Sequence, residues 1–371
     1  MRIAILTELY LPHVGGQEYR YAELAQALIS AGHAVDIYTI RHCPGLPASE
    51  VLNGVRVRRY PTTRDFRKPL FPALKRKQLP MWLYALWVRY RFRAQDYDIV
   101  LMNQWPLSHI VLASAELRRK AIIDWCELRD GGVFRFIQRR FPHMAAANIA
   151  VSAPVAKQLE STCGRPVHCI PSGIWRDRYH GLPREQRDGL IYLGRLTEHK
   201  NIPLLIEAYE LLRNRGYKGS LTIAGEGPSS DEIKNRAARS AYRTDIHFPG
   251  FVDEAQKRSL LASAEVLVIP SRREGFPRVV AEAMASGLPV ATVGYSENGT
   301  CDVVNQYQIG EAADTNADSL AETVLSVCRK WETYSMSGYT SCQELNWSEL
   351  VRALERISRD VSAPARHSRV G

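Results

Sequence analysis

The feature that most constrains this chain is a regular alternation of short apolar runs with helix-like segments along its length. Each apolar run is bounded by loop residues, which is typical of strands buried on both faces of a parallel sheet. Residues 17–31 have apolar side chains at helical spacing and end at Gly32, so they are an expected helix. The expected strands of the first half are residues 3–7, 34–40, 98–102, 121–124 and 148–151.

The same alternation restarts after the polar, turn-rich stretch 180–189. Residues 203–215 are the next expected helix, and the expected strands are 190–193, 221–224 and 266–270. Because 371 residues exceed what one core usually organises, we predict an α/β protein of two doubly wound domains. The expected parts are a first domain over 1–174, a linker over 175–189, a second domain over 190–345 and a final segment over 346–371.

Composition excludes several classes of protein. With 45% hydrophobic and 24% charged residues, the chain is neither a collagen, a coiled coil nor a disordered chain. Its longest apolar stretch, residues 79–88, is about half of what a membrane span needs, and no signal peptide is expected after Met1. The seven cysteines are odd in number and form no CxxC pair, so we expect reduced thiols, as in a cytosolic protein.

The net charge of +10 is concentrated in one segment. Residues 56–93 hold twelve basic residues and one acidic residue, a net charge of +11, and the segment 79–93 adds aromatic side chains. Aromatic and basic residues together suit an anionic lipid surface, although a core helix with a solvated basic rim fits the same pattern. No nucleic-acid-binding motif accompanies the charge, so no nucleic acid partner is expected. The predicted membrane contacts are Lys75, Arg76, Lys77, Trp82 and Trp87.

Two glutamates stand out in the segment 270–290. Glu274 follows an expected strand in a loop, and Glu282 lies inside a helix that starts near Pro277, about 7–8 Å along its axis. Ligands of open α/β sheets bind beyond the carboxyl ends of the strands, where this loop falls. Two such carboxylates can hold hydroxyl groups at two points of one ligand. The alternative is a pair of solvated glutamates stabilised by the helix dipole.

This segment, with its EGFP…EAMASGLPV string, resembles the EX7E signature of the retaining glycosyltransferases of family 4. That family has the GT-B fold of two facing Rossmann-like domains. Residues 194–201 likewise resemble the family's GRLxxxKN element, in which arginine offers a bidentate fork and lysine a point charge to a diphosphate. The resemblance implies that Glu274, Arg195 and Lys200 are the catalytic residues.

Further landmarks follow the family's order. Residues 12–18 resemble its GG loop, where glycines let the backbone approach a phosphate at a helix N-terminus. Residues 223–228 resemble its GxGP turn, residues 247–252 its nucleobase-binding segment, residues 170–174 its interdomain turn, and residues 346–348 the start of a helix returning to the first domain. The donor-binding residues that the resemblance implies are Gly15, Gly16, Gly194, Gly225, Phe251, Val252, Gly275, Phe276, Pro277 and Glu282.

The chain departs from the family in one loop. Many relatives carry a histidine after the strand that corresponds to 121–124, reaching toward the donor sugar, whereas residues 124–131 contain none. Asp124 and Glu127, together with Gln17 near the GG loop, are candidates for the sugar or acceptor contact. A buried aspartate that caps the following turn is the alternative for Asp124.

The resemblance implies a retaining hexosyl- or N-acetylhexosaminyltransferase. Its donor is expected to be a UDP-sugar, or next a GDP-sugar, whose diphosphate lies between Gly16, Arg195 and Lys200. The acceptor is expected to be lipid-linked or a glycan, in cell-envelope polysaccharide or glycolipid synthesis, at the cytoplasmic face of the membrane. No bound cofactor and no obligatory metal are expected. Alternatives are a transferase acting on a soluble small-molecule acceptor and a GT-B epimerase or phosphorylase.

Overall fold

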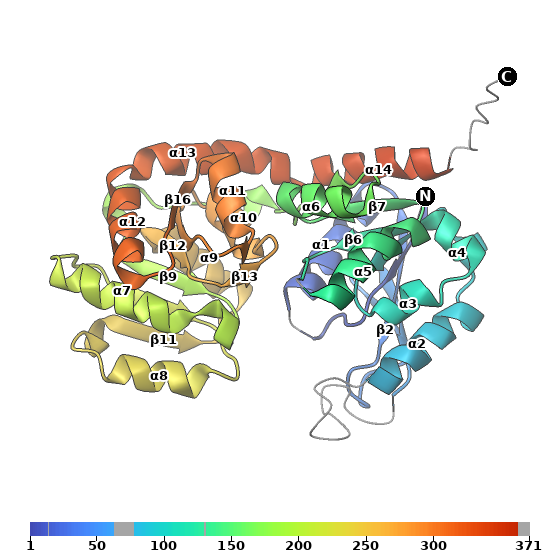
Figure 1. The fold of residues 1–371 in the computed structure, drawn as a ribbon, viewed down its shortest axis with the longest axis horizontal. Helices are drawn as coiled ribbons and strands as arrows, with labels where there is room; N and C mark the ends of the chain where they lie inside the picture. The colour runs from blue at the N-terminus through green and yellow to red at the C-terminus, as the bar shows by residue number, and fades with distance from the viewer. Residues whose placement is uncertain (14, 63–77, 130, 363–371) are drawn as a thin grey trace. The chain divides into compact units, whose positions relative to one another are not determined.

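The computed structural model describes residues 1–13, 15–62, 78–129 and 131–362. It divides into two compact units (Figure 1). The first unit joins Met1–Pro171 to Trp347–Gly371, and the second is Ser172–Asn346. Residues 175–189, expected as a linker, belong to the second unit.

The first unit is built on an eight-stranded sheet in the order β3-β4-β2-β1-β5-β6-β7-β8. Neighbouring strands are parallel, except that β3 pairs antiparallel with β4 in a hairpin. The strands are β1 (Arg2–Leu6), β2 (Ala34–Ile40), β3 (Ser49–Leu52), β4 (Val55–Tyr60), β5 (Ile99–Asn103), β6 (Ala121–Trp125), β7 (Ala147–Ala150) and β8 (His168–Cys169).

Helices connect and cover these strands. The last helix, α14, packs on α1, and the indole Nε1 of Trp347 donates a hydrogen bond to Oε2 of Glu23 at 3.1 Å. This contact explains why the end of the chain belongs to the first unit. The helices are α1 (Gly16–Ser30), α2 (Gln78–Arg91), α3 (Leu107–Val111), α4 (Ala115–Lys120), α5 (Gly132–Arg140), α6 (Ala153–Cys163) and α14 (Trp347–Ser362), with short 3-10 turns at η1 (Ala94–Asp96) and η2 (Phe141–Met144).

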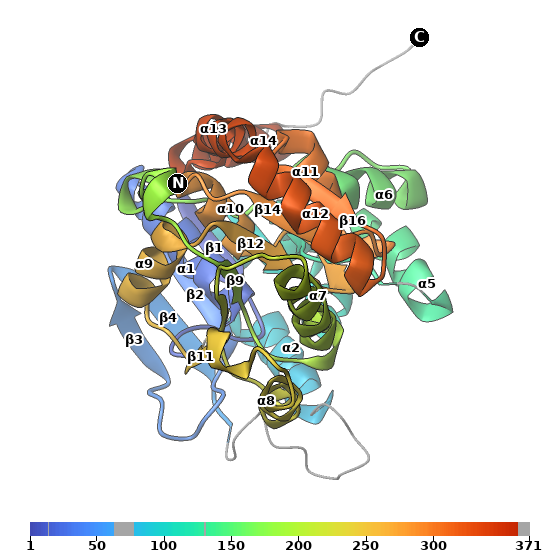
Figure 2. The ribbon, with the colours of Figure 1, turned by 90° about the vertical axis from the view of Figure 1, so that its left-hand side faces the viewer.

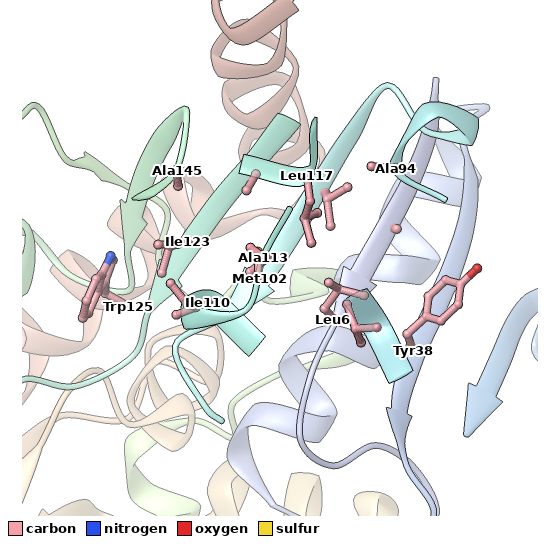
Figure 3. Close-up of a cluster of buried hydrophobic side chains, with 14 of the residues drawn as sticks. Leu6, Tyr38, Ala94, Met102, Ile110, Ala113, Leu117, Ile123, Trp125 and Ala145 are labelled. Carbon is pink, nitrogen blue, oxygen red and sulfur yellow. The ribbon is translucent and has the colours of Figure 1, made fainter. Parts of the chain in front are cut away.

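The core of the first unit lies on the central strands. Leu6, Met102, Ile123 and Trp125 come from β1, β5 and β6, and Figure 3 shows them gathered with helix residues such as Ile110. Each of these strands is buried along nearly its whole length. Burying one such large apolar side chain contributes about 1.5–3 kcal/mol, so the core holds these central strands together.

The second unit has a six-stranded parallel sheet in the order β11-β10-β9-β12-β14-β16 and a separate parallel pair, β13-β15. The strands are β9 (Leu190–Leu193), β10 (Leu221–Ala224), β11 (Ile246–Gly250), β12 (Val266–Ile269), β13 (Arg273–Glu274), β14 (Val290–Val293), β15 (Glu297–Asn298) and β16 (Gly310–Ala313). The order in which β9 lies between β10 and β12 places a topological switch point beside the first strand of this unit.

Helices α7 and α12 pack side by side in this unit (Figure 2). Leu205 of α7 and Val324 of α12 are fully buried in one apolar cluster with the strands. Among the described residues, no helix is long and apolar enough to cross a bilayer. The helices are α7 (Ile202–Asn214), α8 (Ser230–Ala238), α9 (Glu254–Ser263), α10 (Arg278–Ala285), α11 (Thr300–Tyr307), α12 (Ala317–Arg329) and α13 (Trp331–Ser341), with 3-10 turns at η3 (Arg176–Arg178), η4 (Arg184–Gln186), η5 (Glu198–Lys200), η6 (Arg243–Asp245) and η7 (Cys342–Leu345).

Candidate functional site

Three loops of the second unit meet at the carboxyl edge of its sheet. They follow β9, β10 and β12, which are parallel neighbours, so their carboxyl ends share one edge. The amide of Leu196 donates to the carbonyl of Glu226 at 3.0 Å, and the amide of Arg272 donates to the carbonyl of His199 at 2.8 Å. These bonds hold the GRLxxxKN, GxGP and EX7E segments against one another.

Two glycines allow this close approach. A Cβ atom on Gly225 would lie 1.9 Å from the carbonyl oxygen of Gly194, and one on Gly227 would lie 2.1 Å from that of Leu196. Gly225 also has a φ of +135°, which side chains rarely adopt. The structure therefore gives Gly225 and Gly227 a packing role between loops. The expected contact of Gly194 and Gly225 with the donor stays a prediction.

Glu274 and Lys200 form an ion pair at this edge. Nζ of Lys200 lies 2.5 Å from Oε1 of Glu274, and the two side chains are 18% and 12% exposed. The backbone of Glu274 is fixed in β13, where its carbonyl accepts from the amide of Gly299 at 2.9 Å. Arg195 is exposed, and no described residue pairs with its guanidinium. At this edge, Lys200 is thus a cation paired with a carboxylate, and Arg195 is a cation with no partner among the described residues.

Glu282 lies in a different environment from Glu274. It is 2% exposed on α10, and its Oε1 accepts from Nζ of Lys257 at 2.7 Å and from Nε of Arg278 at 3.0 Å. Lys257 also pairs with Glu254 at 2.9 Å. The sequence did not indicate Lys257, because its partner lies on another helix. Glu282 therefore has two cationic partners, Lys257 and Arg278, whereas Glu274 pairs with Lys200.

The other residues of the second unit that were predicted to bind the donor differ in their exposure to solvent. Phe251 follows β11 and is 58% exposed, and Val252 is half-buried. Phe276 is buried, Gly275 is half-buried, and Pro277 is the N-cap residue of α10. Phe251 is thus an aromatic side chain open to a ligand, whereas Phe276 serves the core.

In the first unit, the GG loop precedes α1. Gly15 is the N-cap residue of that helix, and a Cβ atom on it would lie 2.3 Å from Oε2 of Glu18. Oε1 of Glu18 in turn lies 3.0 Å from Nδ1 of His13. Gly16 has nothing within 4 Å of its Cβ position. Gly15 therefore makes room for a carboxylate of the protein itself, and only Gly16 leaves open space for a ligand.

This difference predicts opposite results for two alanine substitutions. Gly15→Ala is expected to displace Glu18 and lower the free energy of unfolding by about 1–3 kcal/mol, because the overpacked side chain must move. Gly16→Ala has room in the free protein, so its stability should stay within about 0.5 kcal/mol of wild type, and any loss should be in ligand binding. Urea denaturation of both variants measures this. Equal destabilisation of the two would contradict it.

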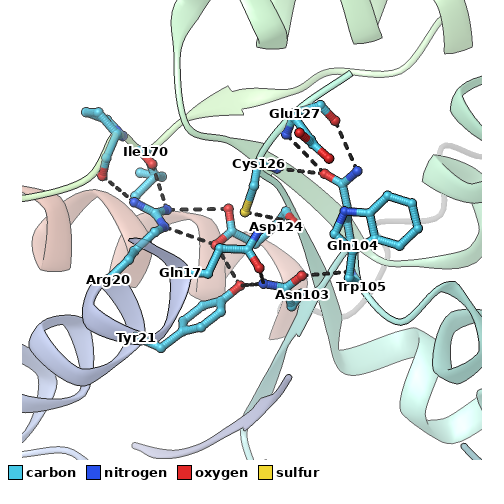
Figure 4. A network of polar contacts seen from close by, with 11 residues as sticks. Gln17, Arg20, Tyr21, Asn103, Gln104, Trp105, Asp124, Cys126, Glu127 and Ile170 are labelled. Atoms are coloured by element: carbon cyan, nitrogen blue, oxygen red, sulfur yellow. Dashed lines mark hydrogen bonds and ion pairs between the residues drawn. The ribbon is translucent and has the colours of Figure 1, made fainter. Parts of the chain in front are cut away.

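A buried polar network joins α1 and β6 of the first unit (Figure 4). Asp124 is 1% exposed and accepts from Nε of Arg20 at 3.2 Å and from the hydroxyl of Tyr21 at 3.0 Å. Arg20 also donates to the carbonyls of Ile170 at 2.8 Å and Pro171 at 2.6 Å. Burial, with the charge of Asp124, raises the pKa of Tyr21 well above its ordinary value. The Asp124 carboxylate is engaged inside the unit, which favours its structural interpretation over the sugar contact.

The loop after β6 is held by Gln104, which the sequence did not indicate (Figure 4). Its Oε1 accepts from the amides of Cys126 at 2.8 Å and Glu127 at 3.2 Å, and its Nε2 donates to the carbonyl of Glu127 at 3.0 Å. The Glu127 side chain pairs with Arg129 at 2.5 Å, and each is 25% exposed. Gln17 accepts from Asn103 at 3.2 Å and is half-buried. Glu127 and Gln17 thus keep partial access to solvent.

The predicted membrane contacts separate into three cases. Lys75, Arg76 and Lys77 lie outside the described residues. Trp82 is 44% exposed on α2. Trp87 instead packs against the core, with its ring 6.1 Å from that of Tyr84, because it lies on the opposite side of the helix.

No cluster of three or more His, Cys, Asp or Glu side chains suited to a metal ion was found in the part of the chain that the structure describes. Arg195 and Lys200, the two cations of the GRLxxxKN segment, lie at the carboxyl edge of the second sheet.

Comparison with known proteins gives two family matches that follow one another along the chain. Residues 14–178 match the model described as Glycosyltransferase Family 4, and residues 174–344 match the model described as Glycosyl transferases group 1. A relative is an uncharacterized glycosyltransferase of Methanocaldococcus jannaschii, 28% identical over 89% of this chain and 90% of its own. Another is a phosphatidyl-myo-inositol mannosyltransferase of Mycobacterium tuberculosis, 24% identical over 98% and 97%.

Solved structures agree on the fold. A sucrose-phosphate synthase from Thermosynechococcus elongatus superposes with a TM-score of 0.78 at 19% identity, over 97% of this chain and 98% of that chain. The Anabaena protein HepE, in complex with UDP and glucose, superposes with a TM-score of 0.71 at 17% identity, over 96% and 98%. With both family models matched in order and the GT-B fold in common, the chain belongs to glycosyltransferase family 4 and is a glycosyltransferase with two Rossmann-like domains.

Proposed function

We propose that this protein is a retaining glycosyltransferase that transfers a hexose or N-acetylhexosamine from a nucleotide-diphosphate sugar to a lipid-linked or glycan acceptor. The observation that carries the proposal is the Lys200–Glu274 ion pair at the carboxyl edge of the second sheet, in the same loop region as Arg195, whose guanidinium pairs with no described residue. Arginine and lysine suit a diphosphate, and a fixed carboxylate suits sugar hydroxyls. A UDP-sugar is the first candidate donor and a GDP-sugar the next, and the UDP complex of HepE supports this order.

In this reaction the bond between the anomeric carbon and the diphosphate oxygen breaks while the acceptor oxygen bonds to the same face of that carbon. The electron pair stays on the diphosphate, and the acceptor proton passes to it. Negative charge therefore grows on the leaving group, and preorganised cations stabilise it most in the transition state. Arg195 and Lys200 supply this charge in the proposal, so it needs no divalent metal. Glu274 then holds a hydroxyl of the sugar as Lys200 turns to the diphosphate.

The test is a thermal-shift screen of UDP-, GDP- and ADP-sugars, followed by turnover assays with lipid-linked and soluble acceptors. We expect one nucleotide class to raise the melting temperature and to support transfer. The anomeric coupling constant of the product, measured by NMR, reports the stereochemistry. A product with an inverted anomeric centre would contradict the retaining mechanism, and absence of binding by all three classes would contradict the donor site.

Glu282 provides a prediction about nucleotide binding. We expect Glu282→Gln to weaken binding of the nucleoside diphosphate about tenfold or more, because a carboxylate that accepts from a ribose hydroxyl contributes about 1.5–3 kcal/mol. Glu254→Gln is the matched control, since Glu254 also pairs with Lys257 but is 41% exposed. Calorimetric titration with UDP and GDP measures both variants. Equal affinities of Glu282→Gln and wild type would assign the buried carboxylate to the fold alone.

The surface of α2 supports a lipid-linked acceptor. Its exposed apolar side chains follow helical spacing and lie beside the exposed arginines Arg89, Arg91 and Arg93. An exposed helix face that combines apolar and basic residues suits an anionic membrane surface, where each basic residue contributes about 1 kcal/mol. The name of the mycobacterial mannosyltransferase gives a phosphatidyl-inositol acceptor, which points the same way. The exposed apolar residues are Leu79, Trp82, Leu83, Leu86 and Tyr90.

We therefore expect the protein to co-sediment with anionic vesicles at low salt and to be released at high salt, because exposed charges are screened. Substituting Trp82→Ser and Arg91→Glu together should abolish binding while donor affinity stays unchanged. Val51→Ser is the control, because Val51 is an exposed apolar residue, 68% accessible, on the hairpin strand β3. A wild type that ignores anionic vesicles would favour the soluble acceptor.

A further inference from the structure

We propose that a pocket of the first unit binds a phosphate group of the acceptor, and that the guanidinium of Arg129 holds this phosphate. The inference rests on the proposed function only in calling the ligand an acceptor, because every residue of the pocket belongs to the first unit. It names the class of acceptor, which is a phosphate ester of a lipid or of a soluble sugar. The sequence did not indicate Arg129, because its surroundings come from separate loops.

The pocket lies at the carboxyl edge of the first sheet, between α5 and the loops that follow β5 and β6. Because β5 and β6 are parallel neighbours, both loops leave the sheet at the edge where ligands of such sheets bind. Figure 4 shows Gln104, Trp105 and Glu127 of these loops close together. The residues that line the pocket include Gln104, Trp105, Trp125, Glu127, Arg129 and Phe134.

Arg129 is held in place by the groups around it. The carbon at the centre of its guanidinium lies 4.9 Å from the centre of the Trp105 ring and 5.6 Å from that of Phe134. Its carbonyl accepts a hydrogen bond from Nε2 of the buried Gln138 at 2.9 Å. A planar guanidinium on aromatic rings, with its backbone fixed, loses little conformational entropy when a ligand binds. The side chain is therefore preorganised.

The contacts of this guanidinium leave one of its edges to a ligand. Nε and Nη2 donate to Oε1 of Glu127 at 2.8 and 2.5 Å, so Glu127 occupies the Nε–Nη2 edge. Nη1 forms no hydrogen bond with any described residue. The Nη1–Nη2 edge therefore keeps two parallel N–H donors, a geometry that matches two oxygens of a phosphate. The Arg129 side chain is 25% exposed, so a ligand from solvent can reach it.

The charge around the pocket also favours an anion. Residues 127–140 contain four arginines and two acidic residues, a net charge of +2. Three of these arginines are exposed on α5, a helix that contains no acidic residue. Such a field attracts a phosphate monoester, with nearly two negative charges, more strongly than a single carboxylate. The exposed arginines of α5 are Arg135, Arg139 and Arg140.

This role differs from that of the cations at the edge of the second sheet. The phosphate of the acceptor keeps its charge throughout the reaction, so Arg129 binds it equally well in the ground state and in the transition state. Losing such an interaction raises KM for the acceptor and leaves kcat nearly unchanged. Arg129 is thus a binding residue that selects the acceptor.

The experiment titrates the full chain with glucose 6-phosphate and with glucose by calorimetry. The nucleoside diphosphate found in the screen is present, so that it fills the second unit. We expect Arg129→Met to weaken binding of glucose 6-phosphate about fivefold or more, because a charge-assisted fork is lost. Arg135→Met is the matched control, since Arg135 is exposed on α5 and does not line the pocket, and its effect should stay below about twofold.

Two further arms refine the test. Arg129→Lys keeps the charge but not the fork, so its affinity for glucose 6-phosphate should stay about threefold or more below wild type. Dihexanoyl phosphatidic acid, used below its micelle concentration, presents the same phosphate on a lipid. Tighter binding of this lipid indicates a lipid-linked acceptor, and tighter binding of glucose 6-phosphate a soluble one. Either supports the pocket when Arg129→Met weakens it.

Several results would overturn the proposal. These are the absence of binding by both phosphate probes, equal binding of glucose and glucose 6-phosphate, wild-type affinity of Arg129→Met, or an equal loss in Arg135→Met. If circular dichroism shows Arg129→Met to be unfolded, Arg129→Lys decides, and wild-type affinity of that variant contradicts the fork. A chain that binds a phosphate probe through Arg129 but binds no nucleoside diphosphate and transfers no sugar would overturn only the proposed function.

Discussion

Replacing Lys200 by methionine is expected to lower turnover by about 10- to 150-fold, the equivalent of losing one charge-assisted contact of about 1.5–3 kcal/mol. Lys200 pairs with Glu274 at 2.5 Å in the free protein, so the substitution removes the cation and also releases the carboxylate. Arg195→Met is expected to cause a loss of at least tenfold, with unchanged stability, because no described residue pairs with that guanidinium. Steady-state kinetics with the identified donor measure both effects.

A double-mutant cycle tests whether Lys200 and Glu274 act as a unit. Glu274→Gln should also reduce turnover, and the double variant should lose less than the product of the two single losses, because the pair is shared. Urea denaturation of each variant separates a loss of folding from a loss of chemistry. Full turnover by Lys200→Met and Arg195→Met together would show that the diphosphate binds elsewhere.

The parallel strands could be predicted from the sequence because they are buried on both faces. The expected strands at 34–40, 190–193 and 221–224 coincide with β2, β9 and β10. The hairpin of β3 and β4 was not predicted, because β4 carries arginines at every second position in part of its length. A third arginine of β4, Arg59, is buried and pairs with Glu50 on the neighbouring strand. Such compensation depends on a partner that the spacing of one strand does not reveal.

The candidate site shows the same division between local and long-range information. The motifs indicated Glu274, Lys200 and Arg195, and the loops that carry them do meet at one edge. The constraint on Gly15 was also local, because residues three positions apart on a helix are neighbours, and Glu18 is in the first turn. From the sequence, we predicted that both glycines let the backbone approach a phosphate. In the structure the Glu18 carboxylate occupies the space at Gly15, so only Gly16 leaves room for a phosphate.

Asp124 could not be assigned from the sequence, because its partner is 104 residues away in the chain. The spacing of residues within one segment does not reveal a partner that lies on a distant helix. The structure supplies that partner in Arg20, whose side chain is 2% exposed against 1% for Asp124. The pair links β6 to α1 and, through the carbonyls of Ile170 and Pro171, to the end of the first unit's main segment. A substitution of Asp124 should therefore mainly lower the free energy of unfolding.

Asp124→Ala is expected to lower the free energy of unfolding by about 3–5 kcal/mol, because it leaves the Arg20 guanidinium buried without its counter-ion. The hydroxyl of Tyr21 loses its acceptor in the same variant. Arg56→Met is the matched control in the same unit, since the Arg56 side chain is 50% exposed and its pair with Asp36 should contribute about 0–1 kcal/mol. Urea denaturation followed by circular dichroism measures both. A stable Asp124→Ala variant that loses turnover would restore the sugar contact, because only a ligand would then depend on the carboxylate.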